Sequence, residues 1–168
     1  MFNSTISEAE NLLDSYMPKA GSYYELKRNF SIDLDTNKNT TSLLSPYIRY
    51  RILSEENILK EVLNKHSYFK AEKYIQEIFW RTYWKGWLEH RPEVYDDYLL
   101  DKNILLNKFE NKKFYQNAII GNTNYKFFNN WVLDLKNNGY LHNHIRMWFA
   151  SIWIFTLNLP WQLGAEFF

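Results

Sequence analysis

Apolar residues recur at helical spacing in several segments of the chain, and polar stretches separate these segments. The first segment carries an apolar stripe made of Ala9, Leu12, Leu13 and Tyr16. Ser7 and Glu10 form a capping-box pattern, which predicts that a helix begins there. Pro18 and Gly21 predict that this helix ends soon after its stripe.

The next part of the chain predicts a loop followed by helices. Residues 31–42 are polar and show no period, which indicates a loop. We then expect a short helix and a second helix capped by Ser54, because two acidic residues follow Ser54 at the positive end of the helix dipole. A long helix is expected over about residues 70–90, ending before Pro92.

The last third of the chain predicts two further amphipathic or apolar helices. Residues 98–122 are less regular and predict only a short helix or two. The helix after them has an apolar stripe of Phe127, Phe128, Trp131, Val132 and Leu135. Gly139 is its expected C-cap, and a final apolar helix over about residues 142–158 ends before Pro160 and restarts at "WQLGAEFF". No segment repeats and none has the pattern of a strand, so the predicted fold is all-α, one helical domain over residues 1–168.

The amino-acid composition excludes some classes of function for this chain. The chain has 168 residues, of which 19% are aromatic, so a well-filled core is possible at single-domain length. Because 20 basic side chains face 19 acidic ones, net charge does not indicate nucleic-acid binding. With zero cysteines, disulfides, thiolate catalysis and Cys-type zinc sites are excluded.

Targeting and membrane signals are absent from the pattern. The N-terminus lacks a basic start followed by an apolar run, so no signal peptide is expected. Residues 147–161 are apolar but shorter than the roughly 20 residues that span a bilayer. We therefore expect a buried helix there, no membrane association, and a cytoplasmic protein.

One face of the long helix could carry chemistry. Tyr74, Glu77 and Arg81 fall within roughly 60° of one another on a helix. The simpler interpretation is a Glu77–Arg81 pair beside a core tyrosine. The alternative is a partly buried site, because many aromatic residues flank these positions: Phe79, Trp80, Trp84 and Trp87.

Three other patterns leave similar alternatives. Asn143, Arg146 and Ala150 share a face of the last helix, either as polar groups facing water or as a ligand site with room for close approach. "TTSLLS" (residues 40–45) suits either plain helix capping or an anion such as phosphate. The "HNH" stretch (residues 142–144) does not indicate a metal, because residues two apart do not share a helical face.

The order of five segments resembles the photolyase/cryptochrome family. These segments are "YELKRNF", "TSLLSPYIRYRILS", "EIFWRTYWKGWLEHRP", "NYKFFNNWVLDLKNNGYLHNHIRMWFAS" and "LPWQLGAEFF". The resemblance covers about residues 22–168 and is to the first part of that family's all-helical FAD-binding domain. It implies FAD as cofactor, held bent in a helical cage.

The resemblance also implies roles for individual residues. The FAD-binding residues would be Tyr24, Thr41, Ser42, Leu43, Leu44, Ser45, Arg81, Asn143 and Arg146. Residues 41–45 match the segment that grips the phosphates, and Asn143 matches an amide near the redox-active edge of the flavin. Trp161 resembles the middle member of the electron-relay tryptophans. The residues implied in catalysis are Glu77, Asn143 and Trp161.

On the substrate side, the resemblance implies DNA with a UV lesion. The residues that would meet the lesion or the DNA rim are Arg28, Tyr74, Glu77 and Trp80. Tyr74 stands where the family often has Trp, and His144 stands where many members have Arg. Both substitutions reduce the expected strength of lesion binding.

Three functions remain open from the sequence. The first is a light-driven, FAD-dependent lyase that splits pyrimidine dimers, and the second is a cryptochrome-like flavin module that signals without repair. The third is a fragment without activity of its own, because the antenna domain and the C-terminal part of the FAD domain are expected to be missing. On that last interpretation, a partner chain or self-association would complete the FAD cage.

Overall fold

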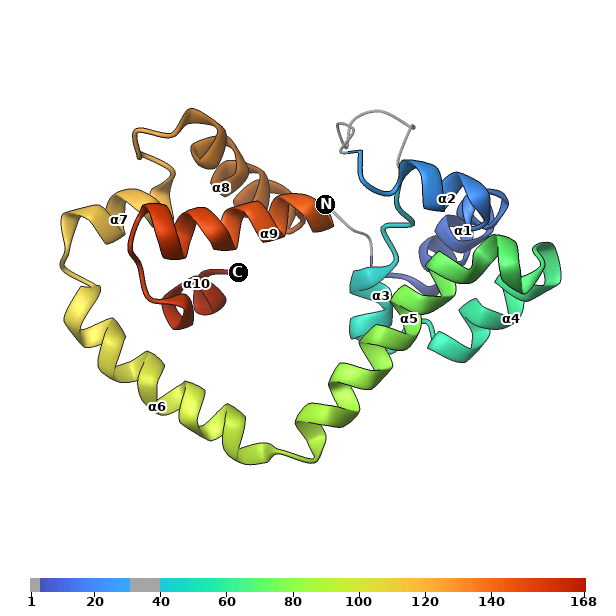
Figure 1. Ribbon diagram of the computed structural model, residues 1–168, viewed down its shortest axis with the longest axis horizontal. Coiled ribbons are helices and arrows are strands. Elements are labelled where there is room, and N and C mark those ends of the chain that lie inside the picture. Colours follow the sequence, from blue (N-terminus) through green and yellow to red (C-terminus); the bar gives the residue numbers. More distant parts are fainter. Residues whose placement is uncertain (1–3, 31–39) are drawn as a thin grey trace. The chain divides into compact units, whose positions relative to one another are not determined.

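All regular elements in the described part of the chain are helices. The computed structural model describes residues 4–30 and 40–168, and within these ranges no strand occurs (Figure 1). The all-α prediction is therefore confirmed. The predicted loop over residues 31–42 lies mostly outside the described residues. The chain divides into two compact units, Phe2–Trp87 and Leu88–Phe168.

The first unit is built from short helices and most of one long helix. Its elements are α1 (Ile6–Tyr16), the short 3₁₀ helix η1 (Met17–Lys19), α2 (Ser22–Lys27), α3 (Ser45–Arg49), α4 (Glu55–Lys65) and α5 (Tyr68–Glu89). The predicted long helix is thus confirmed. Residues from all the major helices meet in one core, in which Ala9, Leu44, Ile58 and Val62 are fully buried. The apolar stripes of α1 and α4 face this core, as their spacing predicts.

The caps of this unit correct one prediction and confirm another. The side chain of Thr5, not Ser7, caps α1, because Thr5 Oγ1 accepts a hydrogen bond from the Glu8 amide at 3.3 Å. The helix begins at Ile6, so Ser7 already lies inside its first turn. Ser54 caps α4 as predicted, with Ser54 Oγ accepting from the Asn57 amide at 3.1 Å.

The second unit contains the remaining helices. Its elements are α6 (Pro92–Phe109), α7 (Lys113–Ile120), α8 (Lys126–Asn138), α9 (Asn143–Ser151), the π-helical turn η2 (Ile152–Thr156) and α10 (Trp161–Phe167). The prediction of a short helix or two over residues 98–122 is confirmed only for α7, because α6 runs unbroken through 18 residues and is not short. No residue of α6 is buried, so the helix has no strong apolar stripe to reveal it.

The last predicted helix is shorter than expected. Regular α9 ends at Ser151, and η2 widens the following turn so that the Leu157 amide donates to the Ile152 carbonyl at 2.8 Å. Asn158 then takes a left-handed backbone, and the chain restarts as α10 after Pro160, as predicted. The predicted C-cap is also confirmed, since Gly139 adopts φ 64° and its amide donates to the Leu135 carbonyl.

The second core is strongly aromatic. Phe128 and Phe149 stack with centroids 4.7 Å apart, and Trp153 continues the stack 6.0 Å from Phe149. Trp153 Nε1 donates to the Pro160 carbonyl at 2.9 Å, which ties the π-turn to the start of α10. Among the described helices, none combines the length and apolar character needed to cross a bilayer.

Candidate functional site

The polar residues of α5 find their partners on other helices. Arg28 Nη1 of the α2 C-cap donates to Glu77 Oε1 at 2.5 Å. Arg81 Nε lies 3.6 Å from Glu55 Oε1 at the start of α4. The simpler prediction, a Glu77–Arg81 pair along the helix, is therefore replaced by two pairs that join α5 to its neighbours. All of these side chains are about one-fifth to two-fifths exposed, so the pairs are only partly desolvated.

Arg81 keeps one unsatisfied donor. Its Nε is buried, and 3.6 Å to Glu55 is too long for a hydrogen bond, so within the described residues this N–H has no hydrogen-bond acceptor. A buried donor left in this state costs about 1–3 kcal/mol. Such an atom can donate a hydrogen bond to an acceptor group of a bound ligand.

Tyr74 lies at the centre of a tyrosine cluster. Its ring is 5.0 Å from the ring of Tyr24, edge to face, and 5.7 Å from the ring of Tyr16. Burial raises the pKa of Tyr74 to about 12, and a hydrogen bond with Ser42 opposes that shift. Tyr74 therefore stays protonated at neutral pH and packs the predicted phosphate-side segment against α5.

The residues before α3 are used partly for local structure. Thr40 Oγ1 donates to the Phe30 carbonyl at 2.6 Å, and Ser42 Oγ accepts from the Leu44 amide at 3.4 Å. Leu43 holds φ at 56°, in the left-handed region that non-glycine residues seldom occupy. Local hydrogen bonds thus account for part of the hydroxyl pattern, whereas no side chain caps the N-terminus of α3. Thr41 and Ser45 stand on the same segment, and their phosphate-side role stays a prediction.

A shallow aromatic groove lies on α5. It measures about 550 Å³ and is lined by Gln76, Phe79, Trp80 and Tyr83. The ring of Tyr83 lies edge to face between those of Trp80, 5.8 Å away, and Trp84, 5.3 Å away. Trp84 is not a core residue, because 52% of it is exposed. The groove gives Trp80 the exposure that a base-stacking role requires.

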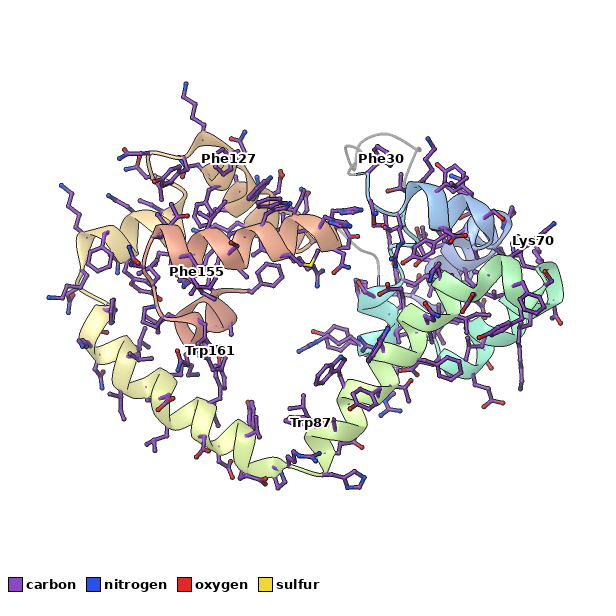
Figure 2. The ribbon with its side chains drawn as sticks, viewed as in Figure 1. Phe30, Lys70, Trp87, Phe127, Phe155 and Trp161 are labelled. Atoms are coloured by element: carbon purple, nitrogen blue, oxygen red, sulfur yellow. The ribbon has the colours of Figure 1, made fainter. Side chains whose placement is uncertain are left out.

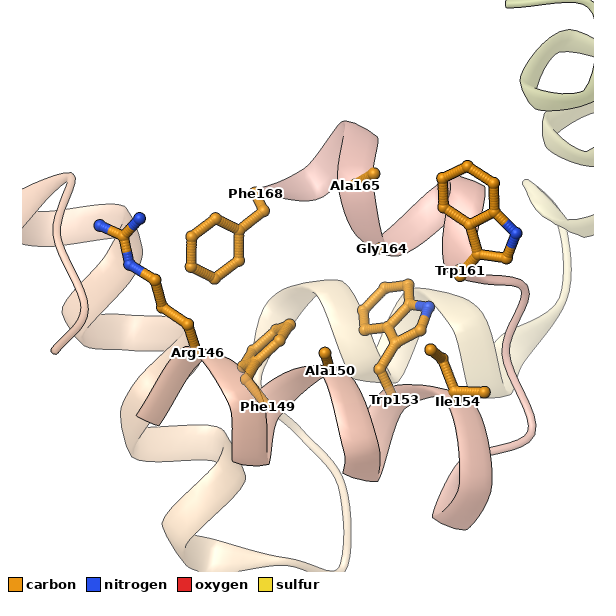
Figure 3. Close-up of a pocket in the computed structure, with 9 residues that line it drawn as sticks. All are labelled: Arg146, Phe149, Ala150, Trp153, Ile154, Trp161, Gly164, Ala165 and Phe168. Carbon is orange, nitrogen blue, oxygen red and sulfur yellow. The ribbon is translucent and has the colours of Figure 1, made fainter. Parts of the chain in front are cut away.

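The second unit holds an apolar pocket with one cation at its edge. The pocket measures about 560 Å³, and Figure 3 shows its lining by Arg146, Phe149, Ala150, Trp153, Ile154, Trp161, Gly164, Ala165 and Phe168. Arg146 and Ala150 of the predicted α9 face lie in this lining, whereas Asn143 is exposed at the start of α9. Sequence reasoning singled out Arg146, Ala150 and Trp161 but missed the other residues of the lining, whose apolar pattern indicates only helix packing: Phe149, Trp153, Ile154, Gly164, Ala165 and Phe168.

Arg146 is held firmly at the pocket edge. Its Nε donates to the Leu141 carbonyl at 2.9 Å, and its guanidinium lies 5.3 Å from the Phe168 ring and 5.6 Å from the Tyr140 ring. Burial lowers the pKa of Arg146, because desolvation disfavours the charged form. A cation in this state gains from an anionic partner.

Trp161 joins the pocket to α6. It is half exposed and lines the pocket, and Figure 2 labels its position at the start of α10. Its ring stacks on that of Tyr98 of α6, with centroids 5.7 Å apart and ring planes 27° apart. Sequence reasoning did not single out Tyr98. The contact could have been predicted only if α6 had been recognised in the sequence as one continuous helix. In the described residues, no group of three or more histidine and acidic side chains could hold a metal ion.

Comparison with known proteins gives a consistent picture. A family model described as the FAD binding domain of DNA photolyase matches residues 74–168. The deoxyribodipyrimidine photo-lyase of Alkalihalophilus pseudofirmus is 27% identical over 157 residues, which cover 93% of this chain and 32% of that protein. The photo-lyase of Buchnera aphidicola subsp. Acyrthosiphon pisum is 26% identical over 96% of this chain and 34% of its own length.

A relative with a different name is also similar. The cryptochrome DASH of Idiomarina loihiensis is 24% identical over 94% of this chain and 35% of its own length. The chain therefore spans about a third of the length of the curated relatives it matches. No solved structure shows a significant match.

Proposed function

The chain belongs to the family of the photolyase FAD-binding domain, and from this membership we propose that it binds FAD and serves the light-driven repair of pyrimidine dimers in DNA. The observation that carries the proposal is Arg146, a half-buried cation beside an apolar pocket lined by aromatic rings. Desolvation makes this guanidinium a strong partner for a negatively charged ligand.

The residues of the second unit suit a flavin. The pocket volume of about 560 Å³ lies in the range of small-molecule sites, and its aromatic lining suits a flat ring system. Arg146 uses its Nε–H for the hydrogen bond to the Leu141 carbonyl. Because a guanidinium is planar, its two terminal NH2 groups extend on the side away from that carbonyl. FAD, when bound, supplies light-driven one-electron transfer. Arg146 would neutralise negative charge on it, and Asn143 would offer an amide donor and acceptor.

The residues that the family resemblance assigns to the phosphate side of the cofactor all lie in the first unit. Tyr24 is fixed by its contact with buried Tyr74, and Arg28 lies over its ring at 5.9 Å. The unsatisfied Nε of Arg81 provides a donor for a cofactor oxygen. The remaining residues of this group are Thr41, Ser42, Leu43, Leu44 and Ser45.

The substrate side of the proposal rests on α5. Trp80 presents an exposed ring beside the groove, which suits stacking on a base that has left the duplex. Glu77 accepts from Arg28 at 2.5 Å, so a lesion that hydrogen-bonds Glu77 must share or replace this contact. Arg28 released in this way would be available to a DNA phosphate.

A blue-light repair assay tests the proposal. The protein is loaded with FAD and reduced, mixed with an oligonucleotide that carries a cyclobutane pyrimidine dimer, and illuminated or kept dark. We expect loss of the dimer in light only, and a strong reduction of that loss in Glu77→Gln. Glu89→Gln, at the exposed end of the same helix, is the matched control and should repair like the wild type. Absence of repair in the flavin-loaded wild type would contradict the repair proposal.

The similarity to a cryptochrome DASH supports a second candidate, a flavin module with another task. Flavin that is retained without any dimer repair would favour this candidate. Completion of the cofactor site by a partner chain or by self-association is a further prediction. It requires the apparent FAD affinity to rise with protein concentration or on addition of the partner.

A further inference from the structure

The side chain of His142 caps the N-terminus of α9. Its Nδ1 accepts a hydrogen bond from the His144 amide at 3.3 Å, and its backbone carbonyl accepts one from the Arg146 amide at 3.0 Å. His142 therefore closes the first turn of α9 with two acceptors, one of which belongs to a ring that can be protonated. The usual caps Ser, Thr and Asn have no such equilibrium near neutral pH, whereas histidine does.

This first turn carries Arg146, the cation at the edge of the pocket. The Arg146 amide donates to the His142 carbonyl, and Arg146 Nε donates at 2.9 Å to the carbonyl of Leu141, the residue before the cap. The backbone of Leu141 and His142 thus holds both the start of the helix and the side chain of Arg146. Figure 3 shows that side chain beside Phe168 at one end of the pocket. If the cap is lost, the turn frays and the guanidinium loses its fixed position.

Protonation of His142 is incompatible with this cap. In a neutral ring that accepts at Nδ1, Nε2 carries the ring hydrogen, so a second proton can add only at Nδ1. The lone pair that accepts from the His144 amide is then gone, and two N–H groups face each other. The new charge also lies at the positive end of the α9 dipole, on a residue that is only 7% exposed. Each effect favours the frayed turn over the capped turn once the ring is protonated.

Charged and titratable groups of several described elements lie around His142. On α9 itself, the ring of His144 lies 6.0 Å from that of His142, and Arg146 lies one turn farther along. Tyr140 precedes the cap, with its ring 5.6 Å from the Arg146 guanidinium. Because Arg146 is a cation and His144 can become one, both oppose a further positive charge on His142. The turn η2 (IWIFT) adds no charge, and the charged side chains of α8 and α10, which also contact α9, are exposed or paired elsewhere: Lys126, Asp134, Lys136 and Glu166, which pairs with Lys102 of α6.

We propose that His142 is a pH-sensitive positioning residue that holds Arg146 ready for an anionic cofactor only while its own ring is neutral. Its effect on FAD binding rests on the proposed function, whereas its effect on α9 does not. Histidine in an unfolded chain titrates at about pH 6.5, so the cap contributes fully above that pH and is lost as the pH falls further. Oxidised FAD keeps the same charge over this range, because its pyrophosphate stays ionised and its ring system stays neutral. FAD affinity should therefore fall on acidification by up to about tenfold per pH unit, the limit for one coupled proton.

Equilibrium dialysis with oxidised FAD at pH 7.5 and at pH 5.5 tests the proposal. His142→Asn is the decisive variant, because an asparagine side chain is a good helix cap and does not titrate. We expect the affinity of the wild type to fall about tenfold between the two pH values, and that of His142→Asn to change by less than about twofold. His142→Ala, which lacks a capping acceptor, should bind FAD about fivefold more weakly than the wild type at pH 7.5. The control His90→Gln, exposed just after α5, should behave like the wild type.

The cofactor-free chain provides a second readout. Because the unfolded chain takes up the His142 proton more readily than the capped helix does, the wild type should lose stability on acidification. His142→Asn has no such proton, so the urea midpoint of the wild type should fall relative to that of His142→Asn between pH 7.5 and pH 5.5. Circular dichroism follows the helices of both proteins. The titration of all other groups is common to both, so it cancels in the difference between the two midpoints.

The proposal is overturned if His142→Asn keeps the wild-type pH dependence of FAD affinity, or if His144→Gln removes that dependence instead. It is also overturned if the wild type binds FAD equally well at both pH values. If FAD binds at neither pH, the proposed function fails and the urea midpoints decide about the cap. A wild-type midpoint that falls relative to that of His142→Asn then supports the pH-sensitive cap, and parallel midpoints overturn it, so the two failures are distinguishable.

Discussion

Gly164 is the position where one methyl group should have the clearest effect. A Cβ added there would lie 3.0 Å from Nε1 and 3.1 Å from Cδ1 of Trp153. Trp153 cannot yield easily, because it is 1% exposed, donates Nε1–H to the Pro160 carbonyl and packs against both Phe149 and Phe167. Overpacking of this kind costs about 1–3 kcal/mol.

The helix itself favours alanine, so the net effect is a difference of two terms. Alanine in place of glycine inside α10 gains up to about 1 kcal/mol in helix propensity. Gly164→Ala should therefore lower the free energy of unfolding by about 1 kcal/mol. Gly86→Ala is the matched control, because Gly86 lies inside α5 and an added Cβ meets no atom within 4 Å. That variant should be more stable than the wild type by about 0.5–1 kcal/mol.

Urea denaturation followed by circular dichroism measures both variants. Tryptophan fluorescence on the same samples shows whether the two units unfold together. Opposite shifts of the midpoint are expected for the two substitutions. Equal stabilisation by both would refute the close packing of Trp153 on α10.

Three further outcomes follow from the contacts of the first unit. Thr5→Ala should cost about 1 kcal/mol of unfolding free energy in urea denaturation, whereas Ser7→Ala should cost clearly less, because Thr5 provides the cap. Between pH 10 and about 12, Tyr74 alone should make the free energy of unfolding fall with a slope approaching 1.4 kcal/mol per pH unit. The reason is that the unfolded chain releases the Tyr74 proton at a lower pH than the folded chain does. Tyr74→Phe should therefore reduce this slope. A double-mutant cycle on Arg28 and Glu77 should give a coupling of about 1 kcal/mol or less, which falls at high salt because both side chains are a third or more exposed.

The helices with a buried stripe could be predicted from the sequence. The spacing in α8 and the glycine after it gave both the element and its left-handed cap, because one face of that helix is buried. The same reasoning failed for α6, which buries no residue completely and therefore lacks the pattern on which the prediction depends. The π-turn after Ser151 was also missed, because it depends on the fit of Trp153 between α10 and the second core.

In the candidate site, too, the sequence predicted local geometry but not tertiary contacts. Spacing placed Tyr74, Glu77 and Arg81 on one face of a helix, and this much follows from local geometry. Their partners do not, since Glu77 meets Arg28 at a sequence separation of 49 residues. Which cation meets which acid depends on how the helices pack, and periodicity contains no information about that.

The central claim is that this chain binds FAD through Arg146, and an equilibrium titration tests it most directly. FAD fluorescence or equilibrium dialysis would measure the affinity of the wild type, of Arg146→Ala and of the exposed control Arg49→Ala. Loss of a charge-assisted hydrogen bond worth about 1.5–3 kcal/mol weakens binding about 10- to 100-fold. The account predicts saturable binding, lowered to that extent by Arg146→Ala and unchanged by Arg49→Ala. Absence of saturable binding, or equal affinity in all three proteins, would contradict it.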